Sequence, residues 1–280
     1  MSISTEEFNL LRTFILEHSE IEVKPEKTYL IESRLSRMMV ELGASNFTEF
    51  YHNAKSDTSG KLRERIIDAM TTNETFWFRD TKPWELMKQT ILPDLIDQKK
   101  KLPPGIKIRI WSAACSTGQE PYSIAMVLSE MLESGKFPGV KLNDFEIIAT
   151  DISPSVLFLA NSGRYNQLAM SRGLPESYKS KYFDQQGKIW VIKPEIKSCI
   201  TFKKFNLQDH PSALGRFNFV LCRNVAIYFT DVFKRELFRR IHGVIEPPGF
   251  FLLGSSESLV GYSTDFNMVE AQGAIFYKKK

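Results

Sequence analysis

The chain has 280 residues, of which 42% are hydrophobic and 25% charged, and its formal net charge is +4. This composition is ordinary for a soluble globular protein, and no apolar run approaches the roughly 20 residues that span a bilayer. The opening MSISTEEFNL lacks the basic and apolar parts of a secretory signal, and the three cysteines form no CxxC pair. We therefore expect a cytoplasmic protein with reduced thiols, no metal and no direct membrane insertion.

The charge is unevenly distributed along the chain. Through Asp80 there are ten lysines and arginines against fourteen acids, whereas the remainder has 27 against 19. Most basic residues are interspersed with acids, and the only tight clusters are Lys99–Lys101 and Lys278–Lys280. A solvated surface is a better interpretation than a nucleic-acid interface, so we expect no nucleic-acid partner.

Residues 1–80 predict a small all-α domain, in keeping with two unequal domains in a chain of this length. Ser4 and Glu7 have the spacing of a capping box at the start of a first helix. A second helix is predicted over 26–42, and shorter ones follow Asn46 and cover 61–70. The apolar face of the second helix is predicted to contain Leu30, Ile31, Leu35, Met38 and Leu42.

Three basic residues of that second helix share a stripe beside its apolar face. Lys27, Arg34 and Arg37 stand at i, i+7 and i+10. Arg34 and Arg37 could bind an acidic partner, although a solvated charged stripe is the more common explanation for such a pattern.

The segment TTNETFWFRD, residues 71–80, breaks the helical periodicity. Small polar side chains, three consecutive aromatic residues and an arginine at a domain junction favour a ligand pocket. The alternative is a loop whose rings fill the interdomain core, and both can hold. Beyond it, Pro83 suits the first turn of a helix through about Leu92, and 98–105 is predicted to be an exposed linker, so 81–105 connects the two domains.

From residue 106 to 280, strand and helix patterns alternate, which predicts an α/β domain with a mostly parallel sheet. Helices are predicted near Pro121, at Pro154 with Ser153 as N-cap, and over 231–242. The last two strands suit an antiparallel hairpin at the sheet edge, and a hairpin over 182–191 predicts an inserted β-subdomain of about 181–199. The predicted strands are Lys107–Ser112, Phe145–Thr150, Ile200–Phe205, Phe217–Cys222, Gly249–Leu253, Phe266–Glu270 and Ala274–Tyr277.

Candidate ligand-binding residues follow the carboxyl ends of these strands, where ligands bind in such sheets. The turn after the first strand, Ala113 to Gly118, is not a GxGxxG loop, and the acids Glu120 and Asp151 would repel a phosphate. Carboxylates here suit a cationic, phosphate-free ligand with ribose hydroxyls and an amino group, as in S-adenosylmethionine. A dinucleotide site remains an alternative, because it also uses one ribose carboxylate.

Five motifs occur in the order TTNETFWFRD, IWSAACSTGQEPYSIAM, ATDIS, CRNVAIYF and GSSES. Together they resemble the CheR family of chemotaxis-receptor glutamate methyltransferases, and the resemblance covers nearly the whole chain. It implies a class I methyltransferase fold behind an α-helical N-terminal domain, with S-adenosylmethionine as donor and receptor glutamates as acceptors. The implied products are a glutamate 5-O-methyl ester and S-adenosylhomocysteine.

The resemblance also implies roles for individual positions. Asp151 would bind the ribose hydroxyls, Glu120 would lie at the methionine portion, and Asn206 with Leu207 would hold the adenine. Asn73, Thr75 and Arg79 would line the cofactor and substrate mouth, and Tyr228 would face the target glutamate or simply pack on the sheet edge. The planar guanidinium of Arg79, rather than the resemblance, makes it our candidate for orienting the target carboxylate. The implied cofactor-binding set is Asn73, Thr75, Arg79, Ala113, Glu120, Asp151, Asn206, Leu207, Asn224 and Val225.

Two departures from the family pattern matter. Some members carry a longer, glycine-rich loop in the inserted hairpin that docks on a pentapeptide at the receptor C-terminus, whereas here only residues 184–188 separate the strands. We therefore expect a pentapeptide-independent monomer that finds the receptor's helical bundle through Arg34 and Arg37. Asn218 stands where aspartate is common, away from the ligand edge, and little consequence is expected.

Two other functions remain open. A non-catalytic module that binds S-adenosylmethionine and signals through protein contacts would be expected to have lost part of the polar set at the strand ends. A methyltransferase for nucleic acid or a small molecule would favour a basic groove or an NPPY-like motif, and the sequence has neither.

Overall fold

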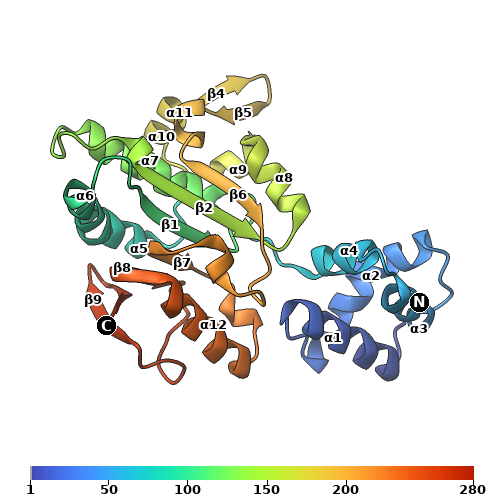
Figure 1. The fold of residues 1–280 in the computed structure, drawn as a ribbon. Helices are drawn as coiled ribbons and strands as arrows, with labels where there is room; N and C mark the ends of the chain where they lie inside the picture. Colours follow the sequence, from blue (N-terminus) through green and yellow to red (C-terminus); the bar gives the residue numbers. More distant parts are fainter. Residues whose placement is uncertain (1) are drawn as a thin grey trace.

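The computed structural model describes residues 2–280 as a four-helix unit beside an α/β unit (Figure 1). Buried side chains from all four helices form one hydrophobic cluster, which is separate from the two clusters of the sheet. The four helices are α1 (Thr5–Ser19), α2 (Thr28–Glu41), α3 (Phe47–Ser56) and α4 (Lys61–Met70). The predicted all-α start of the chain is therefore confirmed.

The capping box predicted at the start of α1 is present. The Ser4 hydroxyl accepts a hydrogen bond from the Glu7 amide at 3.2 Å, and the Glu7 carboxylate accepts one from the Ser4 amide at 2.9 Å. Along α2, the predicted apolar face needs a correction at its end. Met39 is buried, whereas Leu42 is 41% exposed, because the helix ends at Glu41.

A nearly continuous helix leads from the junction to the sheet. It consists of α5 (Thr81–Leu86), a π-helical turn (Met87–Ile91) and α6 (Leu92–Lys101). The exposed linker predicted over 98–105 is wrong in its first part, because residues 98–101 form the last turn of α6, whereas residues 103–105 are non-helical and exposed as predicted. Lys99 is only 8% exposed, and its ammonium donates to the Ile106 carbonyl at 2.6 Å.

The large sheet has seven strands in the order β6-β2-β1-β7-β8-β10-β9. The strands from β6 to β8 are parallel, and β10 is antiparallel to both of its neighbours. The predicted parallel core and the antiparallel edge hairpin are thus confirmed. The strands are β1 (Ile108–Ala113), β2 (Phe145–Asp151), β6 (Ile200–Lys204), β7 (Phe217–Cys222), β8 (Ile245–Leu253), β9 (Phe266–Ala271) and β10 (Ala274–Lys279).

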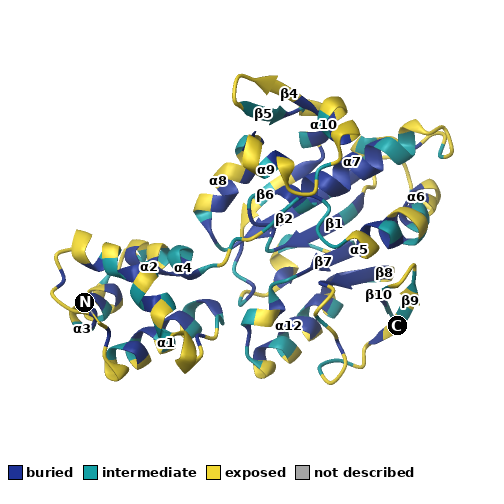
Figure 2. Cartoon of the chain, turned by 180° about the vertical axis from the view of Figure 1, so that it is seen from behind, coloured by how far each residue is buried: buried dark blue, intermediate teal, exposed yellow. Residues whose placement is uncertain are grey.

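Helices cover both faces of this sheet, and the alternation along β1 shows how. Ile108 and Ile110 join the hydrophobic cluster that contains side chains of α5, α6 and α7, whereas Trp111 and Ala113 join the cluster formed with α12. The dark, buried strands between these helices are visible in Figure 2. The helices following β1, β2 and β7 are α7 (Gln119–Glu133), α8 (Pro154–Ser162) and α12 (Asp231–Val244).

The inserted hairpin is present, and it belongs to a three-stranded sheet. Its strands are β4 (Phe183–Gln186) and β5 (Ile189–Ile192). The predicted connection of residues 184–188 is corrected to Gly187 and Lys188, because residues 184–186 pair with β5. A third strand, β3 (Arg164–Asn166), pairs with β5 and was not predicted. Three short helices lie beside this sheet, namely α9 (Gln167–Ser171), α10 (Glu176–Tyr182) and α11 (Pro194–Lys197).

Candidate functional site

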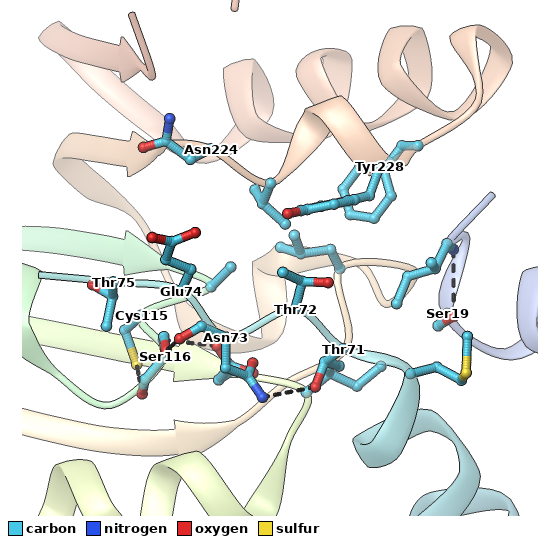
Figure 3. Close-up of a pocket in the computed structure, with 18 of the residues that line it drawn as sticks. Ser19, Thr71, Thr72, Asn73, Glu74, Thr75, Cys115, Ser116, Asn224 and Tyr228 are labelled. Atoms are coloured by element: carbon cyan, nitrogen blue, oxygen red, sulfur yellow. Dashed lines mark hydrogen bonds between the residues drawn. The ribbon is translucent and has the colours of Figure 1, made fainter. Parts of the chain in front are cut away.

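A cavity of about 340 Å³ lies where the helical unit meets the carboxyl ends of β1, β2, β6 and β7. Its size falls within the range of small-molecule sites. Residues of α2, of the 71–79 segment and of the turns after four strands contribute to its wall (Figure 3). The sheet edge and the domain junction, which the sequence singled out separately, therefore border one cavity.

The turn between β1 and α7 exposes backbone to this cavity. Ala114 and Ser116 adopt positive φ angles of 58° and 49°, and Gly118 ends the turn at 93°. A Cβ on Gly118 would lie 3.0 Å from the Ala160 side chain, so glycine suits this position both in conformation and in space. The result is a tight turn of small residues at the start of a 15-residue helix.

Asp151 ends β2 and is 6% exposed. One carboxylate oxygen accepts from the Ser116 amide at 2.8 Å and the other from the Ser153 amide at 3.0 Å. Burial raises the pKa of Asp151, although these backbone hydrogen bonds oppose the shift. Each oxygen keeps further acceptor capacity, so a ligand hydroxyl at this wall would meet a fixed carboxylate.

A largely buried ion-pair cluster contributes Arg223 and Glu120 to the cavity wall. The Arg223 side chain is 2% exposed and pairs with Glu120 at 3.0 Å and with Asp80 at 3.1 Å. Glu120 also accepts from the Ser112 hydroxyl at 2.7 Å. Arg223 is one of the candidates that directly follow the predicted strand Phe217–Cys222, although no contact was predicted for it. An arginine in that position needs buried partners.

The 71–79 segment both lines the cavity and fills the core, the two alternatives that its sequence allowed. Trp77 is fully buried, and its indole donates to the Ala169 carbonyl at 3.1 Å, so one ring fills the core. Phe76 lines the cavity, and the Arg79 guanidinium lies 5.5 Å from its ring centroid. Asn73 faces the β1–α7 turn, because its carbonyl accepts from the Ser116 hydroxyl at 2.9 Å.

Asn206 and Leu207 follow β6 and line the cavity next to the helical unit. The Asn206 amide donates to the His18 carbonyl at the end of α1 at 2.9 Å, which ties this wall to the N-terminal helices. Leu207 is 9% exposed and belongs to the cluster on the α12 face.

The wall after β7 is fixed by a carboxylate that the sequence analysis did not single out. Glu257 accepts from the amides of Asn224 at 2.6 Å and Val225 at 3.1 Å, and from Gly254 at 2.8 Å. A Cβ on Gly254 would lie 2.6 Å from the Glu257 carboxylate, so this arrangement needs glycine. Tyr228 stands on the same wall, facing the side from which Thr72 and Glu74 project (Figure 3).

Most of the predicted site residues meet at this cavity, and two do not. Ala113 packs into the α12-side core, because its place at the end of β1 turns its side chain away from the ligand edge. Arg37 lies outside the cavity, with a 90% exposed side chain that pairs with Glu41 at 2.8 Å. The predicted residues that line the cavity are Arg34, Asn73, Thr75, Arg79, Glu120, Asp151, Asn206, Leu207, Asn224, Val225 and Tyr228.

Arg34 lines the cavity but does not project as a free cation. Its guanidinium donates to the carbonyls of Met70 at 2.8 Å and Thr71 at 3.0 Å, and to the Thr72 hydroxyl at 3.2 Å. It therefore caps the C-terminal end of α4 and fixes the start of the junction segment. The expected pairing of Arg34 and Arg37 on one open stripe is corrected accordingly.

The polar groups that line the cavity suit an organic ligand with hydroxyl groups. Within residues 2–280, no group of three or more His, Cys, Asp or Glu side chains is arranged to hold a metal ion. Over the same residues, no helix is long and apolar enough to cross a membrane. The fixed Asp151 carboxylate, the open backbone turn and the cavity volume together fit a nucleoside-like ligand such as S-adenosylmethionine.

Comparisons with known proteins agree with this geometry. Two family models match, the CheR methyltransferase all-alpha domain over residues 6–71 and its SAM binding domain over residues 73–275. The chain is 42% identical to chemotaxis protein methyltransferase 1 of Pseudomonas aeruginosa and 40% identical to chemotaxis protein methyltransferase Cher2 of Pseudomonas putida, each alignment covering 100% of both chains. It is 36% identical to a chemotaxis protein methyltransferase of Vibrio parahaemolyticus, over 100% of this chain and 99% of the relative.

Proposed function

The chain belongs to the CheR methyltransferase family, and on that premise we propose that it methylates glutamate side chains of chemoreceptors. Membership in the family makes it an S-adenosylmethionine-dependent methyltransferase of chemotaxis. The finer proposal is the acceptor, a receptor glutamate, and the product, a glutamate 5-O-methyl ester formed together with S-adenosylhomocysteine. The fixed, buried carboxylate of Asp151 at the edge of the cavity carries the cofactor assignment.

The proposed cofactor contacts follow from the walls of the cavity. Asp151 would bind ribose hydroxyls, Glu120 would lie at the methionine end, and Asn206 with Leu207 would border the adenine. Asn73 and Thr75 would close the side of the junction segment, and Asn224 and Val225 would close the side of the turn after β7. Ala113 is left out, because its side chain lies in the core.

The chain's own residues have little acid–base work to do. When bound, S-adenosylmethionine supplies a methyl group activated by the positive charge on sulfur. A glutamate carboxylate is already ionised at neutral pH and needs no general base to become nucleophilic. The protein must therefore align the carboxylate and exclude water. We assign that alignment to Arg79, whose guanidinium is a planar fork, and to Tyr228, which lines the same cavity.

The proposed partner is the cytoplasmic helical bundle of a chemoreceptor, with the enzyme acting as a monomer. Arg37 is the exposed cation of α2 that could meet an acidic bundle surface. Arg34 would contribute indirectly, because it positions the junction segment that leads to Arg79.

The test begins with calorimetric titration of S-adenosylmethionine and S-adenosylhomocysteine, with NAD as a control. We expect the first two to bind and NAD to give no heat. A tritiated-methyl assay on cytoplasmic receptor fragments then tests the acceptor, and base-labile label on glutamate is the expected result. Cofactor binding without transfer to any receptor would favour a non-catalytic binding module, and salt-sensitive nucleic-acid binding would favour a different substrate.

We further propose that docking is independent of a receptor C-terminal pentapeptide. The hairpin that carries the docking loop in some family members is closed here by Gly187 and Lys188 alone. A synthetic pentapeptide of receptor sequence should give no heat on titration, while a family member with the longer loop binds it in parallel. Measurable binding to this chain would contradict the proposal.

A further inference from the structure

Two arginines lie close to one aromatic ring of the cavity wall. The Phe76 ring lines the cavity, with the Arg79 guanidinium 5.5 Å and the Arg172 guanidinium 5.4 Å from its centroid. Both distances are within the range of cation–π attraction. Arg79 already has a proposed role, whereas nothing so far accounts for Arg172.

The position of Arg172 is set by tight backbone packing. The Trp77 amide donates to the Arg172 carbonyl at 3.1 Å. Gly173 has a φ of +83°, and a Cβ there would lie 2.1 Å from the Trp77 carbonyl oxygen, so the two segments touch directly. Since Trp77 is fully buried, the Arg172 backbone is anchored to the segment that also carries Phe76 and Arg79.

Arg172 forms an ion pair with a carboxylate of the chain itself. Glu74 lines the cavity, and its carboxylate pairs with Arg172 at 2.8 Å, while its carbonyl accepts from Arg79 at 2.9 Å. Figure 3 shows the Glu74 side chain rising from the junction segment toward Asn224. The two side chains of this pair are 61% and 45% exposed, so the pair is weak and a competing carboxylate can open it.

We propose that Arg172 and Phe76 form a second carboxylate-binding subsite beside the cavity. It takes an acidic side chain of the substrate next to the glutamate that Arg79 orients, and Glu74 holds the subsite when no substrate is bound. The inference rests on the proposed function for the identity of the substrate. The recognition chemistry, in which two guanidinium groups near one aromatic ring bind two carboxylates, is independent of it.

The test uses two ligands, a tetraglutamate peptide with blocked ends and a receptor fragment that accepts methyl groups. Arg172→Ala should weaken tetraglutamate binding and raise KM for the fragment about three- to tenfold, with kcat and S-adenosylmethionine affinity unchanged. Glu74→Gln should act in the opposite direction, tightening tetraglutamate binding and lowering KM about twofold or more, because the competing charge is removed.

A matched pair of controls comes from the opposite edge of the sheet. Arg216 and Glu246 form an ion pair of similar exposure, 58% and 43%, before β7 and at the start of β8. Arg216→Ala and Glu246→Gln should leave both measurements at the wild-type value.

The subsite would be refuted if wild-type protein failed to bind tetraglutamate, if Arg172→Ala matched the controls, or if Glu74→Gln weakened binding. If the proposed function is wrong, the same experiments should give a different result. In that case no receptor fragment would be methylated, while tetraglutamate binding would still depend on Arg172.

Discussion

Replacing Arg79 by alanine is expected to lower kcat/KM for receptor methylation on the order of 100-fold, the loss typical of a misplaced reactant. The guanidinium is the cavity-lining group best suited to orient a carboxylate, and its contacts within residues 2–280 are the hydrogen bond to the Glu74 carbonyl and the Phe76 ring. Initial rates of tritiated-methyl transfer measure the effect.

The variant should remain folded, so that lost activity is interpretable. The backbone carbonyl of Arg79 accepts from the Trp84 indole at 2.9 Å and from Arg223 at 2.8 Å, and the substitution leaves that carbonyl in place. Arg79→Lys keeps the charge without the fork and should recover only part of the rate. Near-normal turnover in folded Arg79→Ala would rule out the orienting role, and a loss confined to S-adenosylmethionine affinity would make Arg79 a cofactor contact instead.

The parallel core of the fold was predictable from sequence because its signals are local. β1, β2 and β7 are runs of mostly buried side chains, and each lies within one residue of its predicted bounds. Since parallel strands end at one edge, the residues that follow them must gather there, whatever the details of packing. That is why Asp151 and Asn224, distant in sequence, both line the cavity.

The directions of long side chains were not predictable, because they depend on packing between elements. The stripe on α2 placed Arg34 correctly on its helix, but the carbonyls it binds belong to the end of α4 and to the junction segment. In the same way, the lysine run at the end of α6 suggested an exposed linker, whereas Lys99 is buried against Ile106 and Asp144. The spacing of charged residues in a sequence does not show whether an arginine or lysine side chain will extend into solvent or bind backbone carbonyls at the end of a helix.

Glu257 illustrates a second limit. Its carboxylate gathers amides from two separate turns, those of Asn224 and Gly254, because β7 and β8 are neighbours in the sheet. The GSSES motif was visible in the sequence, but its function of holding the wall of another turn requires the strand order. Motifs therefore located the site, while the structure supplied the residues that hold it in shape.

Replacing Asp151 by asparagine should weaken S-adenosylmethionine binding at least about 100-fold, because charge-assisted hydrogen bonds to two hydroxyls contribute about 1.5–3 kcal/mol each. The amide also offers one acceptor oxygen where the carboxylate offers two, so either the Ser116 or the Ser153 amide loses its partner. Calorimetric titration measures the loss, and Asp184→Asn, at an exposed position of β4, is the matched control.

The pH dependence gives Asp151 a second, independent signature. Burial raises its pKa above the ordinary value of 3.8, so cofactor affinity in the wild type should fall, on acidification, at a pH above 3.8. The stability of the unliganded protein should depend on pH in the opposite direction. A raised pKa in the folded state means that the stabilising contribution of Asp151 is complete below pH 3.8 and is lost as pH rises through the raised pKa.

The ionised carboxylate therefore destabilises the empty protein at neutral pH, while the same charge is what a cofactor would bind. Urea unfolding across this pH range should show that Asp151→Asn removes the corresponding part of the pH dependence, whereas Asp184→Asn does not. Wild-type affinity that stays constant down to pH 3.8, or an Asp151→Asn variant that binds normally, would show that the carboxylate is structural. A site that binds its ligand through a buried charge is expected to be less stable without it, and Asp151 is the residue where this chain should display that trade-off.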